Sequence, residues 1–226
     1  TASIDPRRFG SYANKEYSAA KGHDAYAKMY VLQLPGEERP AGRPARTTPM
    51  YERLKAKGAV HTEAFGWERP KWFSLDGREE ACGFRHNNVF DVVAQECKAV
   101  RERVGVLELS SFSKYEVTGP DAEKFLNRVC ANRMPHRDGR IRLAHLLTEH
   151  GRIENEFTIT RLAGNHFYLL SAAVSELRDF DLLNHRILEE ESVTVSNISD
   201  NWGCLGSGWT TIQGSAFYSD RCRSAK

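Results

Sequence analysis

Glu154 and Glu156 are the side chains whose type and spacing best suit acid–base chemistry. They stand two residues apart, and alternate residues of a β-strand point to the same side of a sheet. Two carboxylates on one face can accept hydrogen bonds from a ligand or move a proton during a reaction. The same spacing occurs on ordinary solvated strands, where glutamate is common, and spacing alone favours that simpler interpretation.

A hairpin formed by residues 143–159 must position this pair. Two apolar-patterned runs meet at His150-Gly151, where a turn is expected. The second run divides into two faces, one with Ile153, Asn155, Phe157 and Ile159 and the other with Glu154, Glu156, Thr158 and Thr160. The sequence therefore predicts a mostly apolar inner face and an outer face that carries both carboxylates.

The segments around the hairpin predict further strands and helices. Strands are expected at 106–109, 114–118, 166–171 and from Val193, and helices at 89–104, after Gly119-Pro120-Asp121 and at 174–190. The order strand, helix, three strands, helix, strand predicts an α+β fold, with helices covering a mainly antiparallel sheet.

An aromatic segment lies upstream of these elements. Four aromatic residues, Trp67 among them, fall between residues 65 and 73 beside a glycine and a proline. We expect an ordered loop, which is either a plug packed on a domain or the wall of a ligand pocket, and the plug is slightly favoured. A short helix at 51–57 precedes it, and residues 1–49 are polar and broken by turns.

The composition argues against several classes of protein. The chain has 226 residues and a net charge of +2, too balanced to suggest binding to nucleic acid or to an anionic membrane. No apolar run is long enough to span a bilayer. Five scattered cysteines without a CxxC pair indicate reduced thiols in a cytoplasmic compartment. The sequence has neither a Gly-x-Ser-x-Gly elbow nor a Gly-x-Gly-x-x-Gly turn, so we expect no FAD binding by this chain.

A series of short motifs follows one order along the chain. They are Thr48-Pro49-Met50-Tyr51-Glu52, Gly58-Ala59, Phe65-Gly66-Trp67, Pro70, Ala99-Val100-Arg101, Gly105, Phe125-Leu126, Ala131-Asn132, Leu147-Thr148-Glu149, Gly151 and Ile153. In this order they resemble the glycine-cleavage T-proteins, which are aminomethyltransferases that use tetrahydrofolate. The resemblance implies a truncated T-protein-like fold with ferredoxin-like βαβ elements.

The upstream residues narrow the resemblance. Asp5-Pro6-Arg7-Arg8-Phe9-Gly10 and the run from Glu38 to Pro44 resemble dimethylglycine and sarcosine dehydrogenases, in which an FAD oxidoreductase region precedes a T-protein-like folate domain. This implies that residues 1–46 end the FAD region and connect it, and that residues 47–203 form the N-terminal part of the folate domain. A covalently linked FAD domain is expected in a longer, full-length protein.

The resemblance also implies a site and an activity. In T-proteins an Asp-Asp pair follows the central turn, and one carboxylate contacts the folate near N10. Asn155 and Glu156 stand at these positions, so Glu156 is the implied catalytic and folate-binding carboxylate. Further candidate folate-binding residues are Glu154, Tyr115, Asn132 and Trp67, and no metal site is expected. The flavin domain would oxidise an N-methyl amine to an iminium, and the folate domain would capture the one-carbon unit as 5,10-methylenetetrahydrofolate.

Two other functions fit the same motifs. The chain could be a stand-alone aminomethyltransferase, or a non-catalytic folate-binding or regulatory module. The residues before Thr48 favour the dehydrogenase, because a T-protein does not need them.

Residues 204–226 depart from the family pattern. They show no helical or strand period and end in a basic tail. Read one base later, these codons can encode an apolar strand and an Ala-Gly-Pro-Arg-Ser turn like those of the family. We hypothesise one extra base at codon 204, which sequencing of the gene would test, and we expect residues 204–226 to pack poorly.

Overall fold

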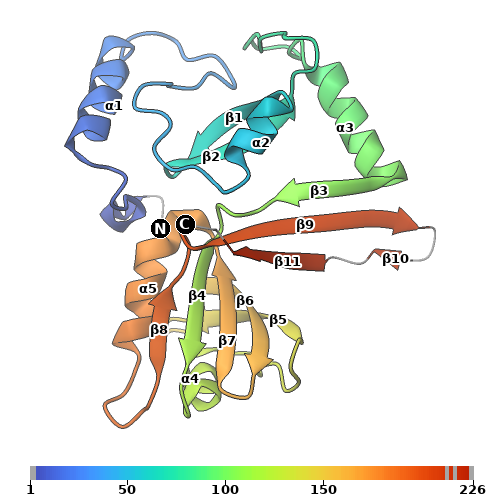
Figure 1. The fold of residues 1–226 in the computed structure, drawn as a ribbon. Coiled ribbons are helices and arrows are strands. Elements are labelled where there is room, and N and C mark those ends of the chain that lie inside the picture. The colour runs from blue at the N-terminus through green and yellow to red at the C-terminus, as the bar shows by residue number, and fades with distance from the viewer. Residues whose placement is uncertain (1–3, 212–213, 216–217, 224–226) are drawn as a thin grey trace. The chain divides into compact units, whose positions relative to one another are not determined.

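The computed structural model describes residues 4–211, 214–215 and 218–223. The chain forms two compact units. We call residues 1–8 and 112–202 the sheet unit, and residues 9–111 and 203–226 the hairpin unit. The predicted hairpin around Glu156 belongs to the sheet unit (Figure 1).

The sheet unit is built on five antiparallel strands in the order β5-β6-β7-β4-β8. Their bounds are β4 (Ser113–Thr118), β5 (Ile141–Leu147), β6 (Ile153–Ala163), β7 (His166–Ser171) and β8 (Thr194–Asn197). The unit also contains the 3-10 turns η2 (Pro6–Arg8) and η3 (Ala173–Ser175) and the helices α4 (Ala122–Val129) and α5 (Glu176–His185). The predicted α+β order is confirmed, although α5 is shorter than the expected helix at 174–190.

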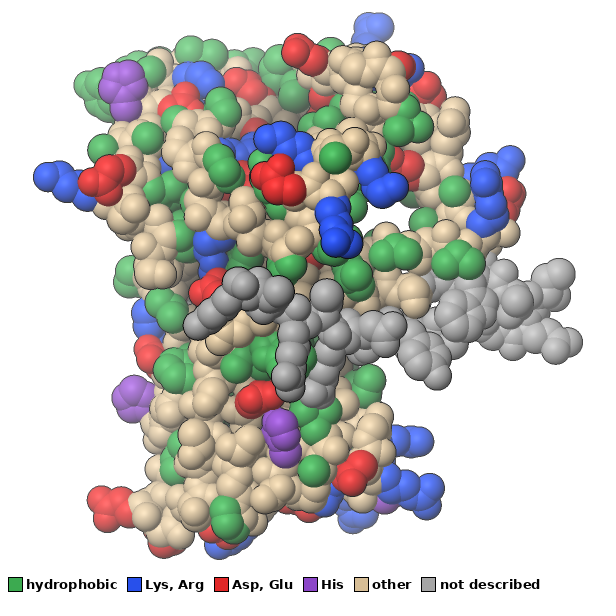
Figure 2. Space-filling view, in the orientation of Figure 1, with side chains coloured by type: hydrophobic (Ala, Val, Ile, Leu, Met, Phe, Trp, Pro, Cys, Tyr) green, Lys and Arg blue, Asp and Glu red, His purple; other side chains and the backbone are tan. Residues whose placement is uncertain are grey.

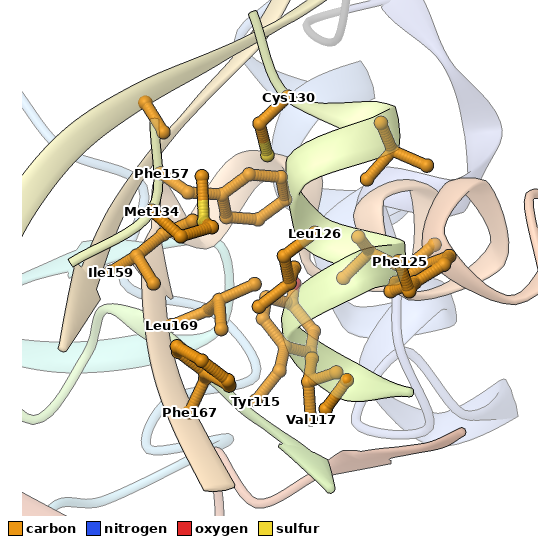
Figure 3. Close-up of a cluster of buried hydrophobic side chains, with 14 of the residues drawn as sticks. Tyr115, Val117, Phe125, Leu126, Cys130, Met134, Phe157, Ile159, Phe167 and Leu169 are labelled. Carbon is orange, nitrogen blue, oxygen red and sulfur yellow. The ribbon is translucent and has the colours of Figure 1, made fainter. Parts of the chain in front are cut away.

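One face of this sheet carries the core of the unit. Phe157 and Ile159 of β6 are fully buried with Phe125 and Leu126 of α4 (Figure 3). The helix contributes because its apolar residues recur every three or four positions and fall on one side. Leu183 of α5 belongs to the same cluster, so both helices cover this face. The alternation along β6 therefore predicted the buried face correctly from Phe157 onward.

The hairpin unit contains more regular structure than the sequence predicted. Its elements are α1 (Lys15–Ala27), α2 (Tyr51–Ala56), β1 (Ala59–Ala64), β2 (Trp67–Phe73), α3 (Phe90–Glu102), β3 (Val104–Glu108), β9 (Trp202–Thr211), β10 (Gly214–Ser215) and β11 (Tyr218–Arg223). The aromatic segment was predicted as a loop, and this is wrong, because it forms strand β2 paired with β1. Helix α1 was not predicted, because it has almost no amphipathic pattern and buries no side chain.

The expectation of no strand pattern after residue 204 is wrong, because β9 continues to Thr211 and is followed by β10 and β11. Strand β9 pairs with β3 in antiparallel register from Glu108–Leu205 to Val104–Trp209. Cys204 is buried, so this segment is not poorly packed at its start. The sequence did not predict this strand because β9 is rich in glycine and has no alternation of apolar residues. Its pairing with β3 is made by backbone groups rather than by side chains. The frameshift itself concerns the gene and stays a prediction.

The surface agrees with the balanced composition. In the face shown in Figure 2, acidic and basic side chains of the described residues are interspersed. No helix within the described part of the chain is long and apolar enough to cross a membrane.

Candidate functional site

A bulge in the central hairpin separates the two predicted carboxylates. Leu146 of β5 stands opposite Asn155, but Leu147 stands opposite Ile153, so Glu154 is an extra residue in β6. Such an insertion changes the face on which side chains emerge. The expectation that Glu154 and Glu156 share a face is therefore wrong. The bulge also explains why Ile153, predicted on the inner face, is 67% exposed.

Glu154 belongs to the side of the sheet that is covered by α5. Its carboxylate forms ion pairs with Arg178 at 3.3 Å and with Arg186 at 2.7 Å. Arg186 also donates to the backbone oxygen of Leu147. Because two guanidinium groups already occupy the carboxylate, Glu154 fastens the end of the hairpin to α5.

Glu156 emerges on the opposite, open face of the sheet. Its side chain is 56% exposed, and its Oε2 lies 3.0 Å from Nε2 of His145. The two residues are direct cross-strand partners in the register of β5 and β6. Sequence reasoning regarded the histidines as unpaired surface residues. The hairpin register would have revealed this pair, since a turn at His150-Gly151 places residue 145 opposite residue 156.

Asn132 joins the same site through the backbone. Its side-chain oxygen accepts a hydrogen bond from the N–H of His145 at 2.9 Å, and the N–H of Ala131 donates to the oxygen of His145 at 2.8 Å. The segment after α4 thus pairs along the outer edge of β5 and fixes the strand at His145. The structure therefore brings together Asn132, His145 and Glu156.

The two aromatic candidates, Tyr115 and Trp67, belong to different units. Tyr115 is fully buried in the core, and its hydroxyl donates to the backbone oxygen of Glu176 at 2.7 Å. Tyr115 is therefore a core residue in this structure rather than a pocket wall. Trp67 belongs to the hairpin unit, where the guanidinium of Arg46 lies 3.9 Å from its ring centre.

A cleft of about 470 Å³ opens at the turn end of the hairpin. It is lined by the end of α4, by Leu147, Thr148 and Glu149, and by Arg186. Its thiol, Cys130, is a poor nucleophile, because burial raises the pKa of that group to about 12. Glu156 is not part of this lining, so the cleft and the carboxylate on the open face are separate features.

The open face fits a ligand that carries N–H groups. A half-exposed carboxylate can accept hydrogen bonds from such groups, and the imidazole beside it can donate or accept a proton. A reduced pterin or an aromatic amine would supply these N–H groups. The accessible acceptor at Glu156 is therefore compatible with tetrahydrofolate.

Two family matches divide the chain near residue 49. Residues 50–208 match the family described as GCVT N-terminal domain, and residues 1–48 match the FAD dependent oxidoreductase central domain.

Curated relatives extend across the junction between these matches. The chain is 35% identical over 212 residues to mitochondrial dimethylglycine dehydrogenase of Mus musculus, covering 90% of this chain and 24% of that protein. It is 29% identical over 210 residues to the mitochondrial pyruvate dehydrogenase phosphatase regulatory subunit of Mus musculus, covering 89% and 24%. The chain thus spans about a quarter of the length of these relatives.

A solved structure has a similar fold. The glycine cleavage system aminomethyltransferase T from Bartonella henselae superposes with a TM-score of 0.59 at 24% identity, over 72% of this chain and 40% of that one. The T-protein-like α+β fold expected from the sequence is confirmed.

Proposed function

Because the chain belongs to the GCVT N-terminal domain family, we propose that it is the tetrahydrofolate-binding part of an FAD-dependent N-methyl amine dehydrogenase. The amine would be dimethylglycine, sarcosine or a related compound. The folate part would capture the one-carbon unit as 5,10-methylenetetrahydrofolate. The match of residues 1–48 to an FAD oxidoreductase domain supports this function over a stand-alone aminomethyltransferase. FAD would belong to a covalently linked domain outside this chain.

The accessible carboxylate of Glu156 is the observation that carries the proposal. It lies on the open sheet face beside His145, while Glu154 is occupied by two arginines on the other side. Glu156 would accept a hydrogen bond from the folate, and His145 would hold that carboxylate in place. Bound tetrahydrofolate would supply the nitrogen atoms that take up the one-carbon unit. The pair would place a proton acceptor next to those atoms.

Titration calorimetry with tetrahydrofolate tests this role. We expect Glu156→Ala to weaken binding by about 10- to 150-fold, because a hydrogen bond to a charged group contributes about 1.5–3 kcal/mol. Glu154→Ala should weaken it less. Glu116→Ala is a matched control, since Glu116 lies on the same sheet face and pairs with His166 at 3.2 Å. Equal affinities of the parent and Glu156→Ala would remove Glu156 from the site.

A second function is favoured by one of the relatives. The pyruvate dehydrogenase phosphatase regulatory subunit is named for regulation, and its similarity covers almost the same part of this chain. The alternative is a folate-binding regulatory module without catalysis. Tetrahydrofolate binding without methylene transfer, measured in the full-length protein with an N-methyl amine substrate, would favour this alternative.

The compartment is also a proposal. Cys82, Cys97 and Cys130 are free thiols, which suits the reducing cytoplasm predicted from the sequence. Both curated relatives named above are mitochondrial proteins.

A further inference from the structure

A buried carboxylate lies behind the site, on the side of the sheet opposite Glu156. Asp179 of α5 is completely buried, and its Oδ2 accepts hydrogen bonds from Ser171 at 2.7 Å and from Ser175 at 2.6 Å. Ser171 ends β7 and Ser175 is the N-cap residue of α5. The acid is therefore anchored to both a strand and a helix.

Asn155 of β6 lies beside this acid, because Arg178, the residue before Asp179, donates to the backbone oxygen and the carboxylate of Glu154. Within the described chain, Oδ1 of Asp179 accepts no hydrogen bond, and the buried Nδ2 of Asn155 donates none. Arg178 lies 3.6 Å from this oxygen as an ion pair. Burial raises the pKa of Asp179, whereas Ser175, Ser171 and the amide of Asn155 act to lower it. A buried amide donor and a buried carboxylate oxygen thus lie near each other, and the amide donor would be costly to leave without an acceptor.

Asn155 connects this acid to the proposed site. Its Oδ1 accepts a hydrogen bond from the N–H of Glu156 at 2.8 Å. Glu156 in turn contacts His145 at 3.0 Å on the open face. Asn155 therefore stands between the buried Asp179 and Glu156, and its oxygen is hydrogen-bonded to the backbone of Glu156.

We propose that Asp179 is a positioning residue, which orients Asn155 and through it fixes the backbone and carboxylate of Glu156. The Asn155 amide can point only one way when its nitrogen faces Asp179, and its oxygen then faces the N–H of Glu156. Nothing in the arrangement requires Asp179 to contact a ligand. Its effect on folate binding rests on the proposed function, but its effect on the Glu156–His145 pair does not.

Nuclear magnetic resonance of the 226-residue chain with labelled histidine tests the positioning directly. In Asp179→Asn, one carboxylate oxygen becomes an NH2 group, so residue 179 can present either a donor or an acceptor and no longer fixes the orientation of the Asn155 amide. We expect the His145 imidazole resonances to shift, whereas those of His166, paired with Glu116 on the same face, should stay. The swap Asn155→Asp with Asp179→Asn restores a donor and an acceptor, so it should return His145 to the parent spectrum. A merely structural role for Asp179 would not produce this pair-specific rescue.

Tetrahydrofolate affinity gives the second measurement. It should fall about tenfold in Asp179→Asn and recover in the swap. A parent that binds no folate would contradict the proposed function, while the His145 spectra would still test the positioning. Unchanged His145 resonances in folded Asp179→Asn would overturn the inference. Should that variant not fold, Ser175→Ala removes one anchor of Asp179, and an unchanged His145 spectrum there would overturn it equally.

Discussion

The sheet unit and the hairpin unit differ in how much apolar surface their helices bury. In the sheet unit, Phe125, Phe157 and Phe167 are fully buried in one apolar cluster. In the hairpin unit, neither α1 nor α3 buries a side chain. Ion pairs occur in both units, and in the hairpin unit Arg43 forms two of them, with Glu68 at 2.6 Å and with Glu38 at 2.9 Å.

Since both units carry ion pairs, this difference in burial decides how much of the stability of each unit depends on its apolar core. Burial of apolar surface contributes about 25 cal/mol per Å² and does not depend on salt screening. Exposed ion pairs contribute about 1 kcal/mol or less and are screened, whereas a buried charge depends strongly on its partner. The two units should therefore respond to different substitutions.

Removal of a core ring should have the largest effect. We expect Phe157→Ala to lower the free energy of unfolding by about 3–5 kcal/mol, because it leaves a cavity between β6 and α4. Urea unfolding followed by circular dichroism measures this loss. Phe84→Ala is the control in the hairpin unit, where the ring is 71% exposed, and its effect should stay within about 0.5 kcal/mol. Similar losses for the two variants would contradict the comparison.

Removal of a buried charge should cause the next largest loss in the free energy of unfolding. Glu68 has a 3% exposed side chain and accepts two hydrogen bonds from Arg43. Glu68→Ala leaves the guanidinium without this partner and should cost about 3 kcal/mol in the same unfolding experiment. The exposed pair of Lys98 and Glu102 at 3.8 Å is the control, and Glu102→Ala should cost less than about 0.5 kcal/mol. Equal losses would mean that burial does not decide the strength of these pairs.

Two acids of the sheet unit, Asp179 and Glu191, allow burial and ion pairing to be compared within one unit. Their contributions to stability should change with pH in opposite directions. Burial raises the pKa of Asp179, so its contribution to stability is present below its unfolded pKa and is lost as pH rises through the folded value. Hydrogen bonds from Arg128 lower the pKa of Glu191, so its contribution is present above its unfolded pKa and is lost as pH falls through the folded value.

Urea midpoints at several pH values on both sides of about 4 should separate the two acids. Relative to the parent, Asp179→Asn should improve as pH rises, because the variant no longer has an acid that is costly to ionise. Glu191→Gln should instead improve relative to the parent as pH falls. Parallel curves for the two variants would contradict the assigned signs.

The sequence predicted the sheet unit better than the hairpin unit for the same physical reason. A buried face leaves an apolar period, as at Phe157 and Ile159, and that period can be read from the sequence. Helix α1 buries nothing and strand β9 is rich in glycine, so neither leaves such a period. At the site, Glu156 and Asn132 were identified through the family resemblance. His145 was missed because cross-strand register, rather than sequence spacing, creates its pair with Glu156.

An exposed apolar stripe on the hairpin unit leads to the prediction with the smallest effect on stability. Phe90 and Val93 of α3 and Val104 and Val106 of β3 are between 37% and 68% exposed. Apolar surface of this kind promotes association between copies. We expect Val93→Lys combined with Val106→Lys to reduce self-association, measured by static light scattering over a concentration series. The free energy of unfolding should change by less than about 0.5 kcal/mol, since neither side chain is buried.

The control variant tests whether added charge alone has the same effect. It combines Leu75→Lys, at an 87% exposed position outside the stripe, with Ile4→Lys, so that it matches the double variant in charge. If this control lowers the scattering as much, net charge rather than the stripe governs association.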